Sequence, residues 1–109
     1  YINKSKFIGS NSEDSLNLFR SNFKISNTLF SDSISDALDV DFSNGSITDS
    51  RFIKTNNDAI DISGSKVVIN NIYINGSGDK AISAGERSIL NAYRVEINDQ
   101  YYNLDYSEY

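Results

Sequence analysis

A period of 22 residues constrains this chain more than any other feature of its sequence. The apolar residues Leu16, Leu38, Ile60 and Ile82 follow one another at that spacing. Their neighbours repeat with them, as Asp-Ala-Leu-Asp-Val-Asp at 36–41, Asp-Ala-Ile-Asp-Ile-Ser at 58–63 and Lys-Ala-Ile-Ser-Ala at 80–84. Self-similarity at a fixed period of roughly 20 to 50 residues is typical of stacked repeat architectures. The period therefore predicts a solenoid before any local preference is considered.

A second apolar column divides the chain into rows. Its members are spaced by 23, 22, 22 and 21 residues and are Phe7, Phe30, Phe52, Ile74 and Val95. Five residues before each member stands the apolar residue that begins the row, namely Ile2, Ile25, Ile47, Ile69 and Leu90. The rows predict about five coils of about 22 residues.

Each row holds three short apolar runs separated by Ser, Gly and Asn. Within a run the apolar residues alternate, as Leu38 with Val40 and Ile60 with Ile62, which is the pattern of a half-exposed strand. Ile, Ser, Thr and Asn disfavour helix interiors, and no stripe of period 3.6 persists. Leucine-rich repeats share the period but need Leu at spaced positions and a helical turn in each unit. We therefore predict an all-β, right-handed parallel β-helix with three short strands per coil.

The ends of the chain differ from its middle. We expect coils over residues 1–97, whereas residues 98–109 are rich in Tyr and predict a divergent cap over the last coil or a further partial coil. Ile2 already occupies a core column, and the chain does not begin with Met, so we expect a fragment of a longer protein. Uncapped coils also predict end-to-end self-association as one possibility.

Composition excludes several classes of function. The chain has 109 residues and a net charge of −5, and its ten Lys and Arg residues are scattered, so we expect no nucleic-acid partner. No apolar run approaches the roughly 20 residues that span a bilayer, so we expect no membrane insertion. Cys and His are absent. Disulfides, thiolate metal sites and hydrolysis that depends on His are therefore excluded within this segment.

Three segments together resemble the right-handed parallel β-helix repeat superfamily, which has the pectate-lyase-like fold. They are Asn-Asp-Ala-Ile-Asp-Ile-Ser-Gly-Ser at 57–65, Ile-Asn-Asn-Ile-Tyr-Ile at 69–74 and Gly-Asp-Lys-Ala-Ile-Ser-Ala-Gly at 78–85. The superfamily includes pectate lyases, polygalacturonases, alginate epimerases and bacterial surface proteins, and the resemblance covers residues 1 to about 97. It implies polysaccharide contact along the outer face of one sheet and a bacterial extracellular or cell-surface location.

The outward positions of the Ala-Ile-Asp-Ile sheet carry the first candidate site. Asp39, Asp41 and Asp61 are expected to share this face. Neighbouring carboxylates raise one another's pKa or recruit a hard cation, so these residues could bind Ca²⁺ or sugar hydroxyls. A solvated acidic face that keeps the solenoid soluble is the alternative. The sequence predicts no other cofactor.

Two further columns are singled out. Arg51 and Arg94, with Tyr73 between them, are expected to project from the Phe/Ile sheet, where they could stack a sugar ring or only pack against each other. The column Asn27, Asp49 and Asn71 falls at the bend after the first strand of each row. Because Asn and Asp tolerate left-handed backbone, we expect a structural ladder there.

These observations favour a non-catalytic scaffold or carbohydrate-contacting module. The resemblance also leaves open part of a polysaccharide lyase, epimerase or hydrolase whose catalytic residues lie outside this segment. A lyase-like activity would need a base that we do not find beside the carboxylates. An adhesin or phage-tail-like structural column is the third possibility.

Overall fold

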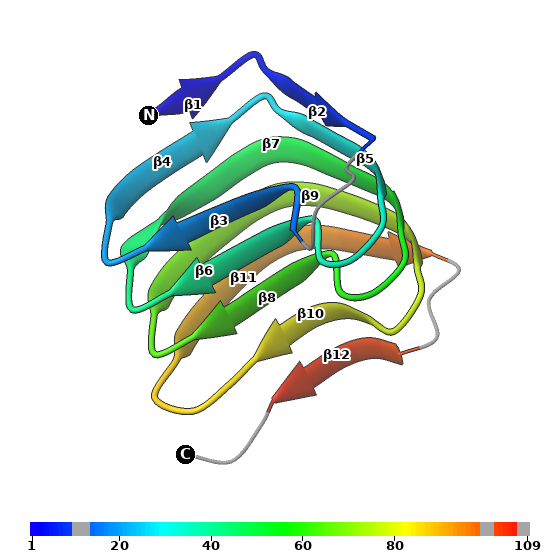
Figure 1. The fold of residues 1–109 in the computed structure, drawn as a ribbon. Coiled ribbons are helices and arrows are strands. Elements are labelled where there is room, and N and C mark those ends of the chain that lie inside the picture. The colour runs from blue at the N-terminus through cyan, green and yellow to red at the C-terminus, as the bar shows by residue number, and fades with distance from the viewer. Residues whose placement is uncertain (10–13, 99–101, 107–109) are drawn as a thin grey trace.

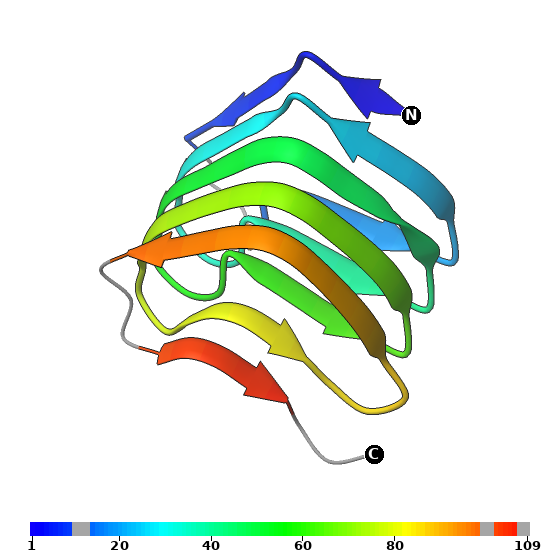
Figure 2. The same ribbon diagram turned by 180° about the vertical axis from the view of Figure 1, so that it is seen from behind.

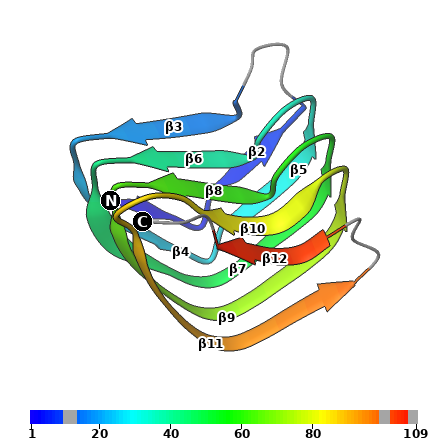
Figure 3. The same ribbon diagram turned by 90° about the horizontal axis from the view of Figure 1, so that it is seen from below.

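The computed structural model describes residues 1–9, 14–98 and 102–106, and its regular elements are all β-strands. Parallel strands stack into a β-solenoid of about four turns (Figure 1). Seen from below, the chain winds anticlockwise as it comes toward the viewer, which makes the solenoid right-handed (Figure 3). The predicted fold class is therefore confirmed. The described residues contain no helix that could cross a membrane.

The flat sheet of the solenoid has five parallel strands in the spatial order β12-β10-β8-β6-β3. The strands are β3 (Leu16–Phe19), β6 (Leu38–Asp41), β8 (Ile60–Ser63), β10 (Lys80–Ala84) and β12 (Tyr102–Tyr106). Neighbouring strands pair at an offset of 22 residues, so that Leu38 lies beside Ile60 and Ile60 beside Ile82. The sequence period is therefore the register of this sheet.

The second sheet is bent into two arms and forms the remaining sides of the solenoid (Figure 2). In the first two coils the arms are separate strands, and from the third coil onward one strand runs through the bend. These strands are β1 (Ile2–Asn3), β2 (Lys6–Ile8), β4 (Asn22–Ser26), β5 (Leu29–Ser33), β7 (Asn44–Thr55), β9 (Lys66–Ser77) and β11 (Ile89–Asn98).

One residue in each coil makes the bend by adopting left-handed backbone. The φ angles in this column lie between 49° and 59°, at Lys4, Asn27, Asp49, Asn71 and Arg94. A single left-handed residue changes the strand direction without breaking the stack of parallel strands. The ladder that includes Asn27, Asp49 and Asn71 is thus the corner between the two arms.

The core lies between the two sheets and is built from the inward columns. Leu38, Ile60 and Ile82 from the flat sheet are at most 1% exposed. From the bent sheet, the rings of Phe30 and Phe52 stack with their centroids 4.6 Å apart. Because each coil places the same residue type over the last, the apolar columns pack along the whole axis of the solenoid.

The solenoid has about four turns, whereas we predicted about five. The prediction counted row starts, and the five starts from Ile2 to Leu90 enclose only four complete repeats. The fifth row is incomplete within the described residues, because its path between Asn98 and Tyr102 lies outside them.

The predicted register of the last coil is wrong by two residues. Ile97, not Val95, pairs with Ile74, and Val95 pairs with Ile72. The turn that precedes β11, at residues 85–88, makes this repeat 23 residues long where we assumed 21. Tyr93, which we expected inside, is 57% exposed. A slip of two residues keeps each side chain on the same face of a strand, so apolar alternation could not reveal it.

The strand β12 continues the flat sheet beyond the four turns. It pairs with β10 in parallel, with Leu104 beside Ile82, and so keeps the offset of 22 residues. Our predicted boundary between the coils and a C-terminal cap falls at 97/98, and the residues 99–101 and 107–109 lie outside the described part of the chain.

Candidate functional site

The outward residues of β3, β6, β8 and β10 form a polar surface on the flat sheet. Asn17, Asp39, Asp61 and Ser83 stand side by side in one column. The Asn17 amide nitrogen donates hydrogen bonds to Asp39 Oδ2 at 3.2 Å and to Asp41 Oδ2 at 3.1 Å. The predicted residues Asp39, Asp41 and Asp61 therefore share one face.

A second column of carboxyls lies at the corner where the chain enters the flat sheet. Asp14, Asp36 and Asp58 are spaced by 22 residues, and Lys80 takes the next position. Asp36 and Asp58 are each only 7% exposed. Asp36 Oδ1 accepts the backbone N–H of Asp58, and Asp58 Oδ1 accepts that of Lys80, both at 3.0 Å. These carboxyls therefore bind the next coil's backbone, which holds them in place beside the polar surface.

The two columns meet in two groups of three carboxyls. Asp14, Asp36 and Asp39 make one group, Asp36, Asp58 and Asp61 make the other, and within each the oxygens lie within 4.8 Å of one another. Asp41 belongs to neither group of this kind among the described residues. We call the polar surface of β3, β6, β8 and β10, together with Asp14, Asp36 and Asp58, the acidic face.

Burial and crowding make two of these carboxyls hold their protons unusually well. Burial raises the pKa of Asp39 to about 7, and the charges of Asp41 and Asp14 add to the effect. Burial raises the pKa of Asp61 to about 8, helped by a hydrogen bond with the Asp36 side chain and by nearby carboxylates. Burial also raises the pKa of Asp58. At neutral pH the acidic face thus combines protonated carboxyls, which donate hydrogen bonds, with carboxyls that accept them.

This arrangement permits three kinds of chemistry. A row of donors and acceptors can bind hydroxyl groups, a protonated carboxyl beside other carboxyls can act as a general acid, and each group of three offers oxygen ligands of the type that Ca²⁺ prefers. A cation there would compete with the protons of Asp39 and Asp61. Asp14, Asp36, Asp39, Asp58 and Asp61 are the residues that could hold it.

The predicted stacking site is only partly assembled. The Arg51 guanidinium lies 5.3 Å from the centroid of the Tyr73 ring, and the two residues pair directly between β7 and β9. Glu96, not Arg94, takes the next position, because the last coil is shifted in register. Arg94 lies at the bend and donates a hydrogen bond to Asn70 Oδ1 at 3.1 Å. Tyr73 therefore does not lie between two guanidiniums.

The predicted ladder of Asn27, Asp49 and Asn71 stands at the bend with side-chain contacts between coils. Asn71 Nδ2 donates to Asp49 Oδ1 at 2.7 Å, and Asn27 Nδ2 donates to Asn3 Oδ1 at 3.2 Å. These contacts join one coil to the next and leave no carboxylate aimed at a shared centre.

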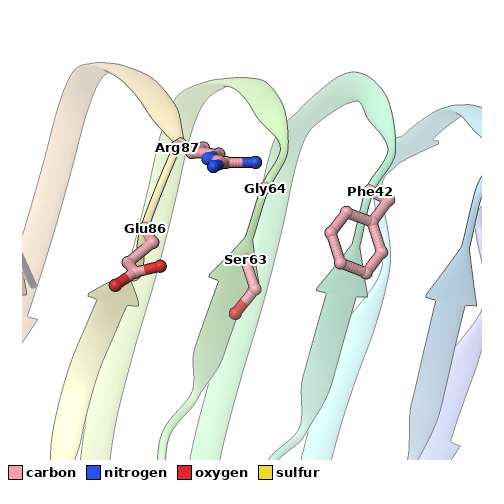
Figure 4. Close-up of a pocket in the computed structure, with 5 residues that line it drawn as sticks. All are labelled: Phe42, Ser63, Gly64, Glu86 and Arg87. Atoms are coloured by element: carbon pink, nitrogen blue, oxygen red, sulfur yellow. The ribbon is translucent and has the colours of Figure 1, made fainter. Parts of the chain in front are cut away.

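A hollow of about 500 Å³ opens at the corner between the flat sheet and the first arm of the bent sheet (Figure 4). Phe42, Ser63, Gly64, Glu86 and Arg87 line it. A Cβ added at Gly64 would come within 2.7 Å of Phe42 Cδ1, so the glycine makes room for that ring. In this column of side chains the glycine is a missing member between Phe42 and Arg87, and the hollow lies there.

No protein-family model, curated protein or solved structure matches the chain. The fold is therefore established by the structure, while the superfamily remains a resemblance. Sequence reasoning assigned Asp36 and Asp58 to turn backbone and did not single out Asp14 as part of a site. The signal that could have found Asp14 is the same period of 22, since it stands 22 residues before Asp36.

Proposed function

We propose that this chain is a non-catalytic β-solenoid module that contacts carbohydrate through its acidic face. The observation that carries the proposal is the direct pairing of Asp39 with Asp61 on a flat sheet, next to Asp36 and Asp58. Side chains of neighbouring strands recur about every 4.8 Å, so the face presents a row of hydrogen-bonding groups. A row fits an extended chain of hydroxylated rings better than a small compact ligand.

The protonation of the face supports the same ligand class. Sugar hydroxyls both donate and accept hydrogen bonds, and a face that holds protonated Asp61 next to hydrogen-bonded Asp36 can satisfy both roles. The resemblance to bacterial surface β-helix proteins supports an extracellular or cell-surface location as part of this proposal. The rigid stack of apolar columns would keep the face flat.

Affinity electrophoresis in gels that contain neutral or acidic polysaccharides tests the proposal. The double variant Asp39→Asn/Asp61→Asn removes the ionisable carboxyls while keeping side-chain size, and we expect its retardation to fall by about tenfold in apparent affinity. The matched control is Asp32→Asn/Asp49→Asn on the bent sheet, where the left-handed backbone also tolerates Asn. Equal retardation of both double variants, or no retardation of the parent chain by any polysaccharide, rejects the acidic face as the contact surface.

Catalysis is the second candidate, because a carboxyl with a pKa of about 8 beside other carboxyls is typical of a general acid. In that case the chain would be part of a polysaccharide lyase, epimerase or hydrolase. Incubation with neutral polysaccharides and polyuronates, followed by assays for reducing ends and unsaturated uronates, separates the two. We expect no turnover. A rate that disappears in Asp61→Asn would favour the enzyme instead.

A further inference from the structure

The basic residues of this chain gather on the bent sheet. Lys24 and Lys66 lie on its first arm, Lys4 and Arg94 at the bend, and Lys6, Arg51 and Lys54 on the second arm, and all seven are exposed. Among the described residues of the strands β1, β2, β4, β5, β7, β9 and β11 and the bend, the acids are Asp32, Asp49 and Glu96. We call this surface the basic face.

The flat sheet carries the opposite charge. Asp39, Asp41 and Asp61 project from it, Asp14, Asp36 and Asp58 lie at its corner, and Asp79 directly precedes β10. Within the described strands of this sheet and that corner, Lys80 is the one cation, and its Nζ lies 3.2 Å from Asp79. Figure 3 shows the flat sheet on one side of the solenoid and the two arms of the bent sheet on the others.

The cations of the basic face are not neutralised within the chain. In the part of the chain that the structure describes, none of the seven forms an ion pair. Arg51 contacts an aromatic ring and Arg94 an amide oxygen, so both keep their charge. Exposed charges of one sign on one side and of the other sign on the opposite side make each copy complementary to another copy of itself.

We propose that copies of this chain associate side by side, with the acidic face of one against the basic face of the next. Opposite potentials steer two such surfaces together and set their register. The molecule measures 29 × 28 × 28 Å, so one face is limited to about 800 Å², which is what each partner buries in an interface of standard size. Because the two contacting surfaces differ, the contact is heterologous and extends into an open row.

This association goes beyond the proposed carbohydrate contact and uses the same acidic face. Polysaccharide and a second copy would therefore compete for that face. Failure of association leaves the carbohydrate proposal intact, since affinity electrophoresis at low protein concentration measures it on single chains. Failure of polysaccharide binding likewise leaves the association intact.

Sedimentation velocity over a range of protein concentrations tests the inference. The measurements are made at about pH 9, where Asp39 and Asp61 are largely ionised and Lys remains charged. At about 0.01 M salt, where the Debye length is about 30 Å, we expect the mean sedimentation coefficient to rise with concentration. At about 1 M salt, where it is about 3 Å, we expect the monomer alone.

Charge reversal locates the contact. Lys6→Glu/Arg51→Glu on the second arm and Lys24→Glu/Lys66→Glu on the first arm each change the net charge by −4, and we expect at least one of them to abolish association. The matched control is Arg20→Glu/Arg87→Glu, which makes the same charge change at the corner, where both residues are exposed. We expect this control to associate like the parent chain.

Mixing provides the complementary result. Asp39→Lys/Asp41→Lys reverses the acidic face, and we expect it to be monomeric alone but to associate with whichever basic-face variant lost association. A parent chain that is monomeric at low salt, association that persists at about 1 M salt, or a corner control that fails like the face variants overturns the inference. Tight binding of polyglutamate to a monomeric parent chain would instead assign the basic face to an anionic polymer.

Discussion

The inner and outer faces of the same three strands behave differently in this molecule. Inside, Leu38, Ile60 and Ile82 keep one chemical type through β6, β8 and β10 and are almost fully buried. Outside, the neighbouring column changes from Asp39 and Asp61 to Ser83. The inner column must fill the same space in every coil, because interior packing tolerates little change in volume. The outer column has no such constraint, so its carboxyls need a different explanation from the repeat itself.

Truncation of the inner column should have the largest effect. Ile60 is 0% exposed, so Ile60→Ala should cost about 2–5 kcal/mol in the free energy of unfolding, measured by urea denaturation. The control is Ile53→Ala, an outward and half-buried residue of β7, for which we expect less than about 1 kcal/mol. If both variants lose the same stability, the assignment of inner and outer faces is wrong.

The outer column should respond to pH. The folded pKa values of Asp39 and Asp61, about 7 and about 8, lie above the ordinary 3.8 that applies to the unfolded chain. The folded state therefore binds more protons, and the resulting stability is fully present below pH about 4 and is lost as the pH rises through about 7 and 8. We expect the melting temperature to fall between about pH 5 and pH 9 because of these two groups.

Asn mimics the protonated carboxyl and should remove this dependence. Asp39→Asn/Asp61→Asn should melt several degrees higher than the parent chain at about pH 9 and within a degree or two of it at about pH 5, since about 1 kcal/mol shifts the melting temperature by roughly 4–8 °C in a domain of this size. Asp41→Asn, on the same face but outside both carboxyl groups of three, serves as the control. A stabilisation that is equal at both pH values would point to a cause other than ionisation.

Calcium can be tested in the same experiment. A cation that binds only the folded state raises its stability by mass action. If Ca²⁺ occupies the acidic face, the melting temperature should rise with calcium at about pH 9 and much less at about pH 6, where protons hold Asp39 and Asp61. An unchanged melting temperature at about pH 9 would reject the calcium hypothesis derived from the sequence.

The repeat made most of the fold predictable. The period of 22 is the spacing of Leu38, Ile60 and Ile82 in the structure, so class, sheet and core follow from it. The register of β11 was not predictable in the same way. The longer turn at residues 85–88 shifts the strand by two positions, and a shift of two leaves the apolar residues Val95 and Ile97 on the inner face in either register.

The candidate site was predictable only where strand alternation decides it. Asp39, Asp41 and Asp61 were placed on one face because alternate residues of a strand project to the same side. Corner residues follow no such rule, since a turn sets where their side chains point. The approach of Asp36 and Asp58 to Asp61 therefore required the structure, as did the raised pKa values that follow from burial.

The bend should be less sensitive than either face of the flat sheet. Asn71 has a φ of 59° and donates to Asp49, so Asn71→Ala loses both the tolerance for left-handed backbone and one exposed hydrogen bond. We expect a loss of about 1 kcal/mol in urea denaturation. Asn71→Gly keeps the backbone freedom and serves as the control, with a smaller loss. If the glycine variant is the less stable of the two, backbone conformation does not determine the residue at this position.

The smallest effect is expected where Arg51 lies over Tyr73 on the outer face of the bent sheet. An exposed cation–π contact contributes about 0.5–1 kcal/mol, so Arg51→Ala should lower the free energy of unfolding by no more than that. Arg51→Lys keeps the charge but not the planar group, and it separates stacking from charge. A double-mutant cycle with Tyr73→Leu measures the coupling of the two side chains directly. A coupling near zero would leave Arg51 as a charge of the basic face alone, and its replacement by Glu would then act on association without acting on the fold.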